Sequence, residues 1–362
     1  MVEDVEAMNL LEELVRIPSP SGREQDASEF LVGWMSAHGF DATVDEAGNA
    51  VGSRGSGEKE ILLLGHIDTF PGNPPVRREG NVLYGRGSVD AKGPLCAFAV
   101  AASRVDPPDG WKVTVVGAVE EESATSKGAR YVLARRPDGP VACVIGEPSR
   151  WDRVTLGYKG RLLLDLRMRA PYSHSAGAGA LPAERAVSTW LRILDFSKAF
   201  NEGRSRAFDR LIPSLRRIET KDVGAYGEAE LTVGFRLPPD LAPEELESII
   251  RDLLISDGDI SLDLEFRGHE RAYKSPRNTK LVRAFLNSVR SLGGKPKFVV
   301  KTGTSDMNVV GPHWPRTEIV AYGPGDSSLD HTPEEHTDLA EYLKAIEVLE
   351  GVLRDLLSGS YG

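Results

Sequence analysis

The sequence predicts an α/β protein: a mixed, mainly parallel sheet with helices on both faces, interrupted by an inserted α+β domain with an antiparallel sheet. Three observations support this fold class. Short continuous apolar runs such as residues 60–65 alternate with helical patterns in the first third of the chain. Residues 161–169 alternate apolar and charged side chains, which is typical of a strand with one wet face. After Ser275 the sequence again alternates short apolar runs with helical patterns.

The first third is expected to alternate strands and helices. In the segment 24–38, Ala27, Phe30, Leu31 and Trp34 share one stripe, which predicts an amphipathic helix. Strands that alternate with helices indicate a parallel sheet covered on both sides. The expected strands are 60–65, 112–119 and 141–145, and the further expected helices are 95–104 and 127–135.

Near residue 159 the expected strands change from continuous apolar runs to alternating apolar and charged residues, which predicts two domains. Residues 1–158 and 274–362 are expected to form one larger, discontinuous domain, and residues 159–273 a smaller inserted domain. In the insertion we expect strands at 161–169, 228–236 and 261–266 and helices at 182–200 and 244–254. Beyond it we expect helices at 280–292 and 337–357 and strands at 297–300 and 318–321.

Composition narrows the class of protein. Hydrophobic residues make up 40% and charged residues 27%, as in a soluble globular protein. The net charge of −10 argues against a general nucleic-acid binder. Cys96 and Cys143 lie in apolar surroundings and are expected to be buried packing residues. No run approaches the ~20 apolar residues that span a bilayer, and no secretory leader is evident, so we expect a cytoplasmic protein.

His66 and Asp68 follow the expected strand 60–65. In extended backbone, residues i and i+2 point the same way, so the imidazole and the carboxylate would project together from the carboxyl end of a strand. Open α/β sheets bind ligands at that end, and a carboxylate beside a histidine is typical of a metal site. The alternative is an ordinary polar turn.

Further carboxylates and a second histidine follow other strands or lie on loops. Asp90 lies between glycines, where an ordinary turn is the alternative reading. Three glutamates at 120–122 follow the strand 112–119; they are either solvated surface or are neutralised by a multivalent cation. Glu147 follows the strand 141–145, and His331 lies beyond the strand 318–321.

These residue types predict a metal centre. Nitrogen and oxygen donors without thiolates suit zinc or a similar divalent ion, and cobalt suits the same ligands. Five donors are too many for one open catalytic zinc and fit two metals that share a bridging carboxylate. Paired metals activate a water and polarise a carbonyl, while a glutamate next to a ligand can act as the general base.

Six motifs in order resemble the aminoacylase/carboxypeptidase-G family of zinc metallopeptidases, which includes acetylornithine deacetylase and succinyl-diaminopimelate desuccinylase. Together they extend over about residues 60–336, and six motifs in one order are far more specific than any single one. The motifs are GHIDTFPG (65–72), GRGSVDAKG (85–93), EEES with SKGAR (120–130), GEPS (146–149), TGTSDMN (302–308) and DHTPEEH (330–336).

The resemblance implies two Zn²⁺ per subunit, for which Co²⁺ can substitute. His66 and Glu147 resemble the ligands of one metal. Glu122 and His331 resemble the ligands of the other, and Asp90 resembles the bridge between them.

The resemblance also implies catalytic residues. Asp68 resembles the carboxylate that orients the first histidine ligand. Within the three glutamates, Glu121 resembles the general base and Glu122 the ligand, because their spacing to Gly128 matches the desuccinylase pattern. A register with Glu120 as the base stays open.

Other positions resemble parts of a substrate site. His174 resembles a lid-domain histidine that stabilises the oxyanion, with a surface loop as the alternative. Arg236 resembles the arginine of an Asp-x-Arg pattern, but Gly234 replaces the acid here. The residues assigned to substrate binding are Arg236, Thr304, Ser305 and Gly323.

Within the family, the phrases AVEEES, SKGAR and LGYKGRL are most similar to hydrolases that release lysine or ornithine from the C-terminal glutamate of an acidic amino-group carrier protein. This implies a step late in lysine or arginine biosynthesis. The resemblance further implies that residues 1–158 and 274–362 form the di-zinc catalytic domain, and that the insertion 159–273 is a lid or dimerisation domain through which a homodimer forms. Residues 159–221 carry 13 Lys or Arg and 6 Asp or Glu, which could steer an acidic protein. The alternatives are an acetylornithine deacetylase, a desuccinylase or a dipeptidase acting on a small substrate.

Overall fold

The computed structural model describes residues 2–123, 125–171, 181–254 and 261–359. Tertiary contacts divide the chain into two compact units. Unit 1 consists of Met1–Gly157, Lys274–Val300 and Ser305–Gly362, and unit 2 of Tyr158–Tyr273 and Lys301–Thr304. The catalytic and lid roles assigned to the two predicted domains stay predictions.

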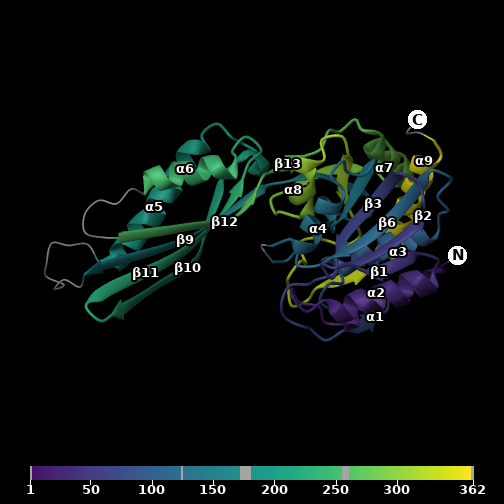
Figure 1. The fold of residues 1–362 in the computed structure, drawn as a ribbon, viewed down its shortest axis with the longest axis horizontal. Helices are drawn as coiled ribbons and strands as arrows, with labels where there is room; N and C mark the ends of the chain where they lie inside the picture. The colour runs from purple at the N-terminus through teal and green to yellow at the C-terminus, as the bar shows by residue number, and fades with distance from the viewer. Residues whose placement is uncertain (1, 124, 172–180, 255–260, 360–362) are drawn as a thin grey trace. The chain divides into compact units, whose positions relative to one another are not determined.

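The largest sheet of unit 1 is mixed. Nine strands of the described chain form it in the order β1-β2-β6-β3-β7-β15-β8-β13, with β14 paired to β8 (Figure 1). The central strands β6, β3, β7 and β15 run parallel, while β1, β2 and β8 pair antiparallel. The strands are β1 (Asp41–Val44), β2 (Ala50–Gly55), β3 (Lys59–His66), β6 (Trp111–Ala118), β7 (Ala142–Gly146), β8 (Arg153–Tyr158), β13 (Tyr273–Lys274), β14 (Lys297–Lys301) and β15 (Glu318–Tyr322).

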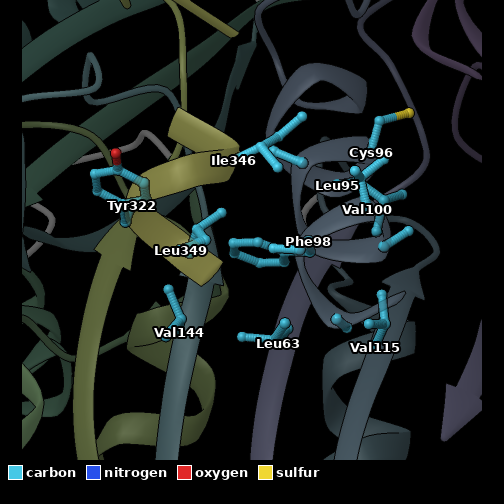
Figure 2. Packing of buried hydrophobic residues seen from close by; sticks show 14 of the residues in the cluster. Leu63, Leu95, Cys96, Phe98, Val100, Val115, Val144, Tyr322, Ile346 and Leu349 are labelled. Carbon is cyan, nitrogen blue, oxygen red and sulfur yellow. The ribbon is translucent and has the colours of Figure 1, made fainter. Parts of the chain in front are cut away.

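Helices cover both faces of this sheet because its central strands are apolar on both sides. Leu63 packs in one large cluster with residues of α3 and α9, as Figure 2 shows, while its neighbours Leu62 and Leu64 are equally buried but face the other way. The helices of unit 1 are α1 (Asp4–Arg16), α2 (Gln25–Ala37), α3 (Lys92–Ser103), α4 (Lys127–Arg135), α7 (Lys280–Ser291), α8 (Asp306–Val310) and α9 (Leu339–Leu357), with a short 3₁₀ helix at Gly311–His313.

Glycines let the central strands and α3 approach closely. A Cβ on Gly146 would lie 2.8 Å from Cα of Gly65 and 3.0 Å from Cε2 of Phe98. No side chain fits in that space, so glycine is required where β3 and β7 run side by side.

A small antiparallel sheet in unit 1 joins distant parts of the chain. In the described residues it has the order β16-β5-β4, from β4 (Arg77–Glu79), β5 (Val82–Tyr84) and β16 (His336–Asp338). Its pairing holds the segment after the 331–335 loop beside the segment before residues 85–91.

Unit 2 is an antiparallel sheet with two helices on one face. Its four described strands lie in the order β10-β11-β9-β12, with α5 and α6 on the same side (Figure 1). Alternate residues of β9, such as Leu164 and Leu166, face Ile193 of α5 and Ile250 of α6 in a second core. The elements are β9 (Gly160–Pro171), α5 (Pro182–Phe200), β10 (Ile212–Val223), β11 (Tyr226–Leu237), α6 (Pro243–Leu253) and β12 (Ser261–Glu270), with a 3₁₀ helix at Ala207–Asp209.

The open face of this second sheet carries paired charges. Arg167 lies 3.3 Å from Glu230 across β9 and β11, and Arg267 lies 2.8 Å from Asp165. Lys221 of β10 also pairs with Glu230 at 3.3 Å. Arg167 and Lys221 of the basic segment 159–221 therefore meet an acidic partner on β11. The whole insertion 159–273 carries 17 Lys or Arg and 19 Asp or Glu.

The predicted fold class is confirmed: a mixed, mainly parallel sheet with helices, and a separate antiparallel sheet. The helices α4 and α5 begin and end at the predicted residues, and the predicted strand 60–65 extends from Lys59 to His66. The sequence did not indicate α1 or β10. β10 is mostly exposed and lacks a regular alternation of apolar residues, so its sequence does not mark it as a strand. Its pairing with β11 does.

Two further expectations have an outcome in the structure. Cys96 and Cys143 are free and buried, as expected of packing residues. No helix in the described part of the chain is long and apolar enough to cross a membrane.

Candidate metal centre

Three of the five predicted ligands lie at or just after the carboxyl ends of neighbouring parallel strands. His66 is the last residue of β3, residues 120–122 follow β6, and Glu147 follows β7. Because β6, β3 and β7 are adjacent and parallel, their carboxyl ends meet at one edge of the sheet.

Four predicted ligands come together at this edge. Nε2 of His331 lies 2.8 Å from Oε1 of Glu122 and 3.1 Å from Oδ2 of Asp90. Nε2 of His66 lies 3.4 Å from the other oxygen of Asp90, Oδ1. Asp90 therefore directs one carboxylate oxygen to each imidazole. Asp90, Glu122 and His331 each offer a ligand atom, and these atoms all lie within 4.8 Å of one another.

The imidazole of His66 is oriented from its Nδ1 side. Nδ1 lies 3.0 Å from the backbone oxygen of Asp68 and 3.4 Å from its Oδ1. A proton on Nδ1 would point toward Asp68, and in that tautomer Nε2 carries the lone pair. Nε2 is buried and has no hydrogen-bond partner among the described residues. Such a histidine is typical of a metal ligand.

Asp68 also holds the backbone of the adjacent glutamates. Its Oδ1 accepts a hydrogen bond from N–H of Glu121, and its Oδ2 accepts one from N–H of Glu122, both at 3.0 Å. Oδ2 accepts a third from the hydroxyl of Ser21 at 2.7 Å. The side chain of Asp68 is fully buried. Its carboxylate thus links His66 to the segment that carries the predicted base.

Glu120 points elsewhere. Its carboxylate accepts a hydrogen bond from the hydroxyl of Thr125 at 2.7 Å and lies 3.7 Å from Nζ of Lys127. By contrast, Glu122 contacts His331, and the charge of Glu121 interacts with His66. These contacts favour the register in which Glu121 and Glu122, rather than Glu120, belong to the centre.

His331 and Glu120, which precedes the proposed base, have strained backbones. Glu120 has φ of 59° and His331 has φ of 62°, in the left-handed region that non-glycine residues rarely adopt. Such conformations persist where surrounding contacts impose them, and they cluster at functional sites. For Glu120, the N–H that donates to Oε1 of Glu24 at 3.2 Å is one such contact.

The electrostatics of the centre show competing effects. Burial raises the pKa of the Glu121 carboxyl well above its usual range; His66 opposes this and Glu147 adds to it. Burial also raises the pKa of Glu122. Asp90 differs: burial would raise its pKa, but the imidazoles of His331 and His66 outweigh burial and hold it well below its usual range. Hydrogen bonds to Asp90 and Glu122 raise the pKa of His331 to about 10.

These observations fit a divalent cation. Clustered buried carboxylates are unfavourable unless positive charge compensates them, and a bound divalent cation would supply that charge. The lone pair of His66 and the carboxylates of Asp90 and Glu122 are hard or borderline donors of the kind that zinc and similar ions bind.

The remaining predicted residues lie in different surroundings. Glu147 is buried after β7 and raises the pKa of Glu121 by charge repulsion. Gly323 follows β15, and a Cβ there would lie 2.9 Å from the backbone oxygen of Glu147. Ser305 caps α8, where its hydroxyl accepts a hydrogen bond from N–H of Met307 at 3.2 Å.

Two predicted substrate residues belong to unit 2, and one falls outside the described residues. Arg236 donates a hydrogen bond from Nη1 to the hydroxyl of Thr304 at 2.8 Å, so these two residues lie together. His174 lies in the segment 172–180, which is outside the described residues. The substrate roles of all these residues stay predictions.

One neighbour of the centre was missed by sequence reasoning. The ring of Phe70 stacks on the imidazole of His331, with centroids 4.4 Å apart and planes 11° from parallel. Phe70 is 40% exposed, so the residue that stacks on this histidine is also partly open to solvent. It lies in the same motif as His66, and an aromatic residue within a metal-binding motif was the available signal.

The parallel strand ends with their carboxylates and imidazoles define a metal-dependent hydrolase of the α/β class. The chain belongs to the peptidase family M20/M25/M40, and the sequence model of that family matches residues 62–355. Members of this family are metal-dependent and typically dinuclear. The protein is accordingly a hydrolase that acts on amide bonds.

Proteins similar to this chain over nearly its full length support its assignment to this family. The chain is 47% identical to a LysW-lysine hydrolase of Deinococcus radiodurans, covering 98% of each protein. It is 31% identical to a LysW-lysine/LysW-ornithine hydrolase of Sulfurisphaera tokodaii, covering 94% of each. The fold resembles that of an M20 family metallo-carboxypeptidase from Sulfolobus solfataricus, with a TM-score of 0.78, 17% identity and coverage of 98% and 99% of the two chains.

Proposed function

We propose that this protein hydrolyses the amide bond that joins lysine, ornithine or both to an acidic amino-group carrier protein, as a late step of lysine or arginine biosynthesis. The observation that carries the proposal is the 47% identity over 98% of both chains to a hydrolase whose name gives LysW-lysine as its substrate. An activity of this kind also suits the cluster of donors at the strand ends.

We propose that the centre binds two Zn²⁺ ions, for which Co²⁺ can substitute. His66 and Glu147 would hold one ion and Glu122 and His331 the other. The two oxygens of Asp90 face two different imidazoles, at 3.4 and 3.1 Å, as suits a carboxylate that bridges two ions. When bound, such a pair lowers the pKa of a water and polarises the scissile carbonyl.

The protein's own groups would then carry the proton. Glu121 is the proposed general base: it accepts the proton of the attacking water and passes it to the leaving amine. Its environment suits this role, because burial raises the pKa of its carboxyl and so favours the uptake of a proton. Asp68 holds the N–H of Glu121 and so orients the base. We propose that His174 stabilises the oxyanion that forms on the scissile carbonyl.

The substrate panel that tests the function has two arms. The metal-free protein would be reconstituted with Zn²⁺ or Co²⁺ and given the carrier–lysine and carrier–ornithine conjugates, with release of the free amino acid measured by mass spectrometry. The second arm would use N-acetylornithine, N-succinyl-diaminopimelate and a dipeptide. We expect the higher kcat/KM on a carrier conjugate. Equal or faster turnover of a small substrate would reject the carrier assignment in favour of a deacetylase, desuccinylase or dipeptidase.

We also propose that unit 2 mediates a homodimer. Val187 and Leu191 of α5 are 50% and 52% exposed, and Ile218 of β10 is 43% exposed. β10 pairs only with β11 in the described sheet, so its other edge is open. We expect a dimer by analytical ultracentrifugation and a monomer for Leu191→Asp. A wild-type monomer at micromolar concentration would contradict this assignment.

A further inference from the structure

Glu335 is a buried carboxylate that no step of the proposed reaction uses. It lies in the motif of His331, four residues further along the chain, and its side chain is fully buried. Buried carboxylates need hydrogen-bond partners or opposite charge, and the partners of Glu335 all come from the loop that carries Asp90.

Three backbone N–H groups converge on one oxygen of this carboxylate. Oε1 of Glu335 accepts hydrogen bonds from N–H of Gly87 at 2.9 Å, of Val89 at 3.0 Å and of Asp90 at 3.1 Å. The backbone oxygen of Glu335 accepts a fourth from N–H of Gly85 at 3.1 Å. The position of Asp90 is therefore set by Glu335 through the peptide groups that precede and include it.

The other oxygen of Glu335 binds Arg86. Nη1 of Arg86 donates to Oε2 at 2.7 Å, and the guanidinium is itself almost fully buried. Its two other nitrogens reach two further segments: Nη2 donates to the backbone oxygen of His331 at 3.4 Å, and Nε to that of Gly72 at 3.2 Å. The planar guanidinium has the fork of donors that such a three-way contact requires.

The ion pair Arg86–Glu335 thus joins three segments of unit 1, each of which carries a proposed ligand or its support. The first runs from the end of β3 to Gly72 and contains His66 and Asp68, the second is the loop 85–91 with Asp90, and the third contains His331. We propose that Arg86 and Glu335 are positioning residues that hold Asp90 and His331 at the separation required for two metal ions. The inference rests on the proposed metal centre and concerns how that centre is assembled.

Such a role differs from a general contribution to folding. If the pair only stabilised unit 1, its loss would lower the thermal midpoint and leave the metal affinity of the folded protein unchanged. If it positions ligands, its loss weakens metal binding in protein that is still folded. Substitution of a group that orients metal ligands typically weakens affinity by about 10–100-fold.

The chain offers a matched control at the opposite end of β3. Glu60 is also buried and paired with an arginine: Arg136 donates to it from Nε at 2.9 Å and Nη2 at 3.1 Å, and Thr114 donates at 2.7 Å. Glu60 and His66 occupy opposite ends of the same strand. Glu60→Gln therefore removes a comparable buried charge without touching the proposed ligands.

The test compares the wild type with Glu335→Gln, Arg86→Gln and Glu60→Gln. Metal-free full-length proteins would be titrated with Zn²⁺ against a chromophoric chelator, and with Co²⁺ while the visible spectrum reports its coordination. We expect two bound ions in the wild type and in Glu60→Gln. In Glu335→Gln and Arg86→Gln we expect about 10–100-fold weaker binding of at least one ion and an altered Co²⁺ spectrum. Arg86→Lys, which keeps the charge, should recover part of the affinity.

The outcomes separate this inference from the proposed function. Wild-type affinity in both Glu335→Gln and Arg86→Gln would overturn the positioning role and leave the metal centre intact. Should Glu335→Gln fail to fold, Arg86→Gln decides, because it leaves the three N–H contacts of Glu335 in place: weaker binding supports the role and unchanged binding rejects it. A wild type that binds neither ion would reject the metal centre, and the inference with it.

Discussion

The carboxylate of Asp68 offers the most direct test of how the site is held together. It accepts hydrogen bonds from N–H of Glu121, from N–H of Glu122 and from the hydroxyl of Ser21. In Asp68→Asn an amide NH₂ replaces one of the two oxygens. Whichever way the amide turns, its NH₂ group faces at least one of the two backbone N–H groups, which then loses its acceptor.

The size of the effect follows from these contacts. A buried N–H without an acceptor is destabilising by about 1–3 kcal/mol, and the remaining bonds weaken because they no longer involve a charge, so we expect a total of about 2–4 kcal/mol. For a unit of this size this corresponds to a thermal midpoint about 5–15 °C lower. Ser21→Ala removes one donor and leaves both N–H contacts intact, so its effect should be about 1 kcal/mol.

Kinetics should separate position from stability. Displacing a catalytic group by 1 Å can reduce the rate about 10²-fold, so kcat of Asp68→Asn on the carrier–lysine conjugate should fall by about that factor while KM changes little. Thermal unfolding of the metal-free proteins and steady-state kinetics of the reconstituted ones would be measured side by side. If Asp68→Asn matched Ser21→Ala in both midpoint and kcat, the carboxylate would not be holding the segment 121–122.

Three further predictions concern the base, the sheet and the substrate. Glu121→Gln should retain both metal ions but lose about 10²–10⁴-fold in kcat. A variant that keeps both ions and full activity would eliminate Glu121 as the base. Gly146→Ala should lower the thermal midpoint, since its Cβ would lie 2.8 Å from Cα of Gly65; a destabilisation of about 1–3 kcal/mol is expected, and an unchanged midpoint would contradict this packing. Raising the ionic strength should lower kcat/KM for the carrier conjugate, by about tenfold at most because acidic partners offset the basic segment 159–221, whereas a flat response would reject electrostatic steering.

The strand ends were predictable because their signal is local. A continuous apolar run followed by a polar side chain predicts both a buried strand and the edge at which ligands gather, and His66, Glu122 and Glu147 follow that pattern. The position of Asp90 was only suggested by its glycines. What fixes it is Glu335, which lies 245 positions further along the chain.

Other features depend on tertiary structure and left little trace in the sequence. β10 is a strand chiefly because β11 pairs with it, since its side chains are mostly exposed. The register of the three glutamates likewise depends on partners distant in sequence: Asp68 holds Glu121 and Glu122, while Glu120 turns to Thr125. The count of the charge excess in 159–221 was correct, but the sheet places acidic side chains of β11, such as Glu230, beside the basic ones.

The discontinuity of unit 1 has a consequence for how the protein is made. Ribosomes deliver the chain from its N-terminus, and His331 emerges 184 positions after Glu147, roughly 10–40 s later at ordinary rates of synthesis. Until then β15 is absent, so β7 has an open apolar edge where β15 will later pair. The nascent chain therefore holds an incomplete sheet and an incomplete set of ligands while the insertion, whose strands are nearly contiguous in sequence, is already able to fold. A chain truncated before residue 318 would accordingly retain unit 2 but aggregate through β7.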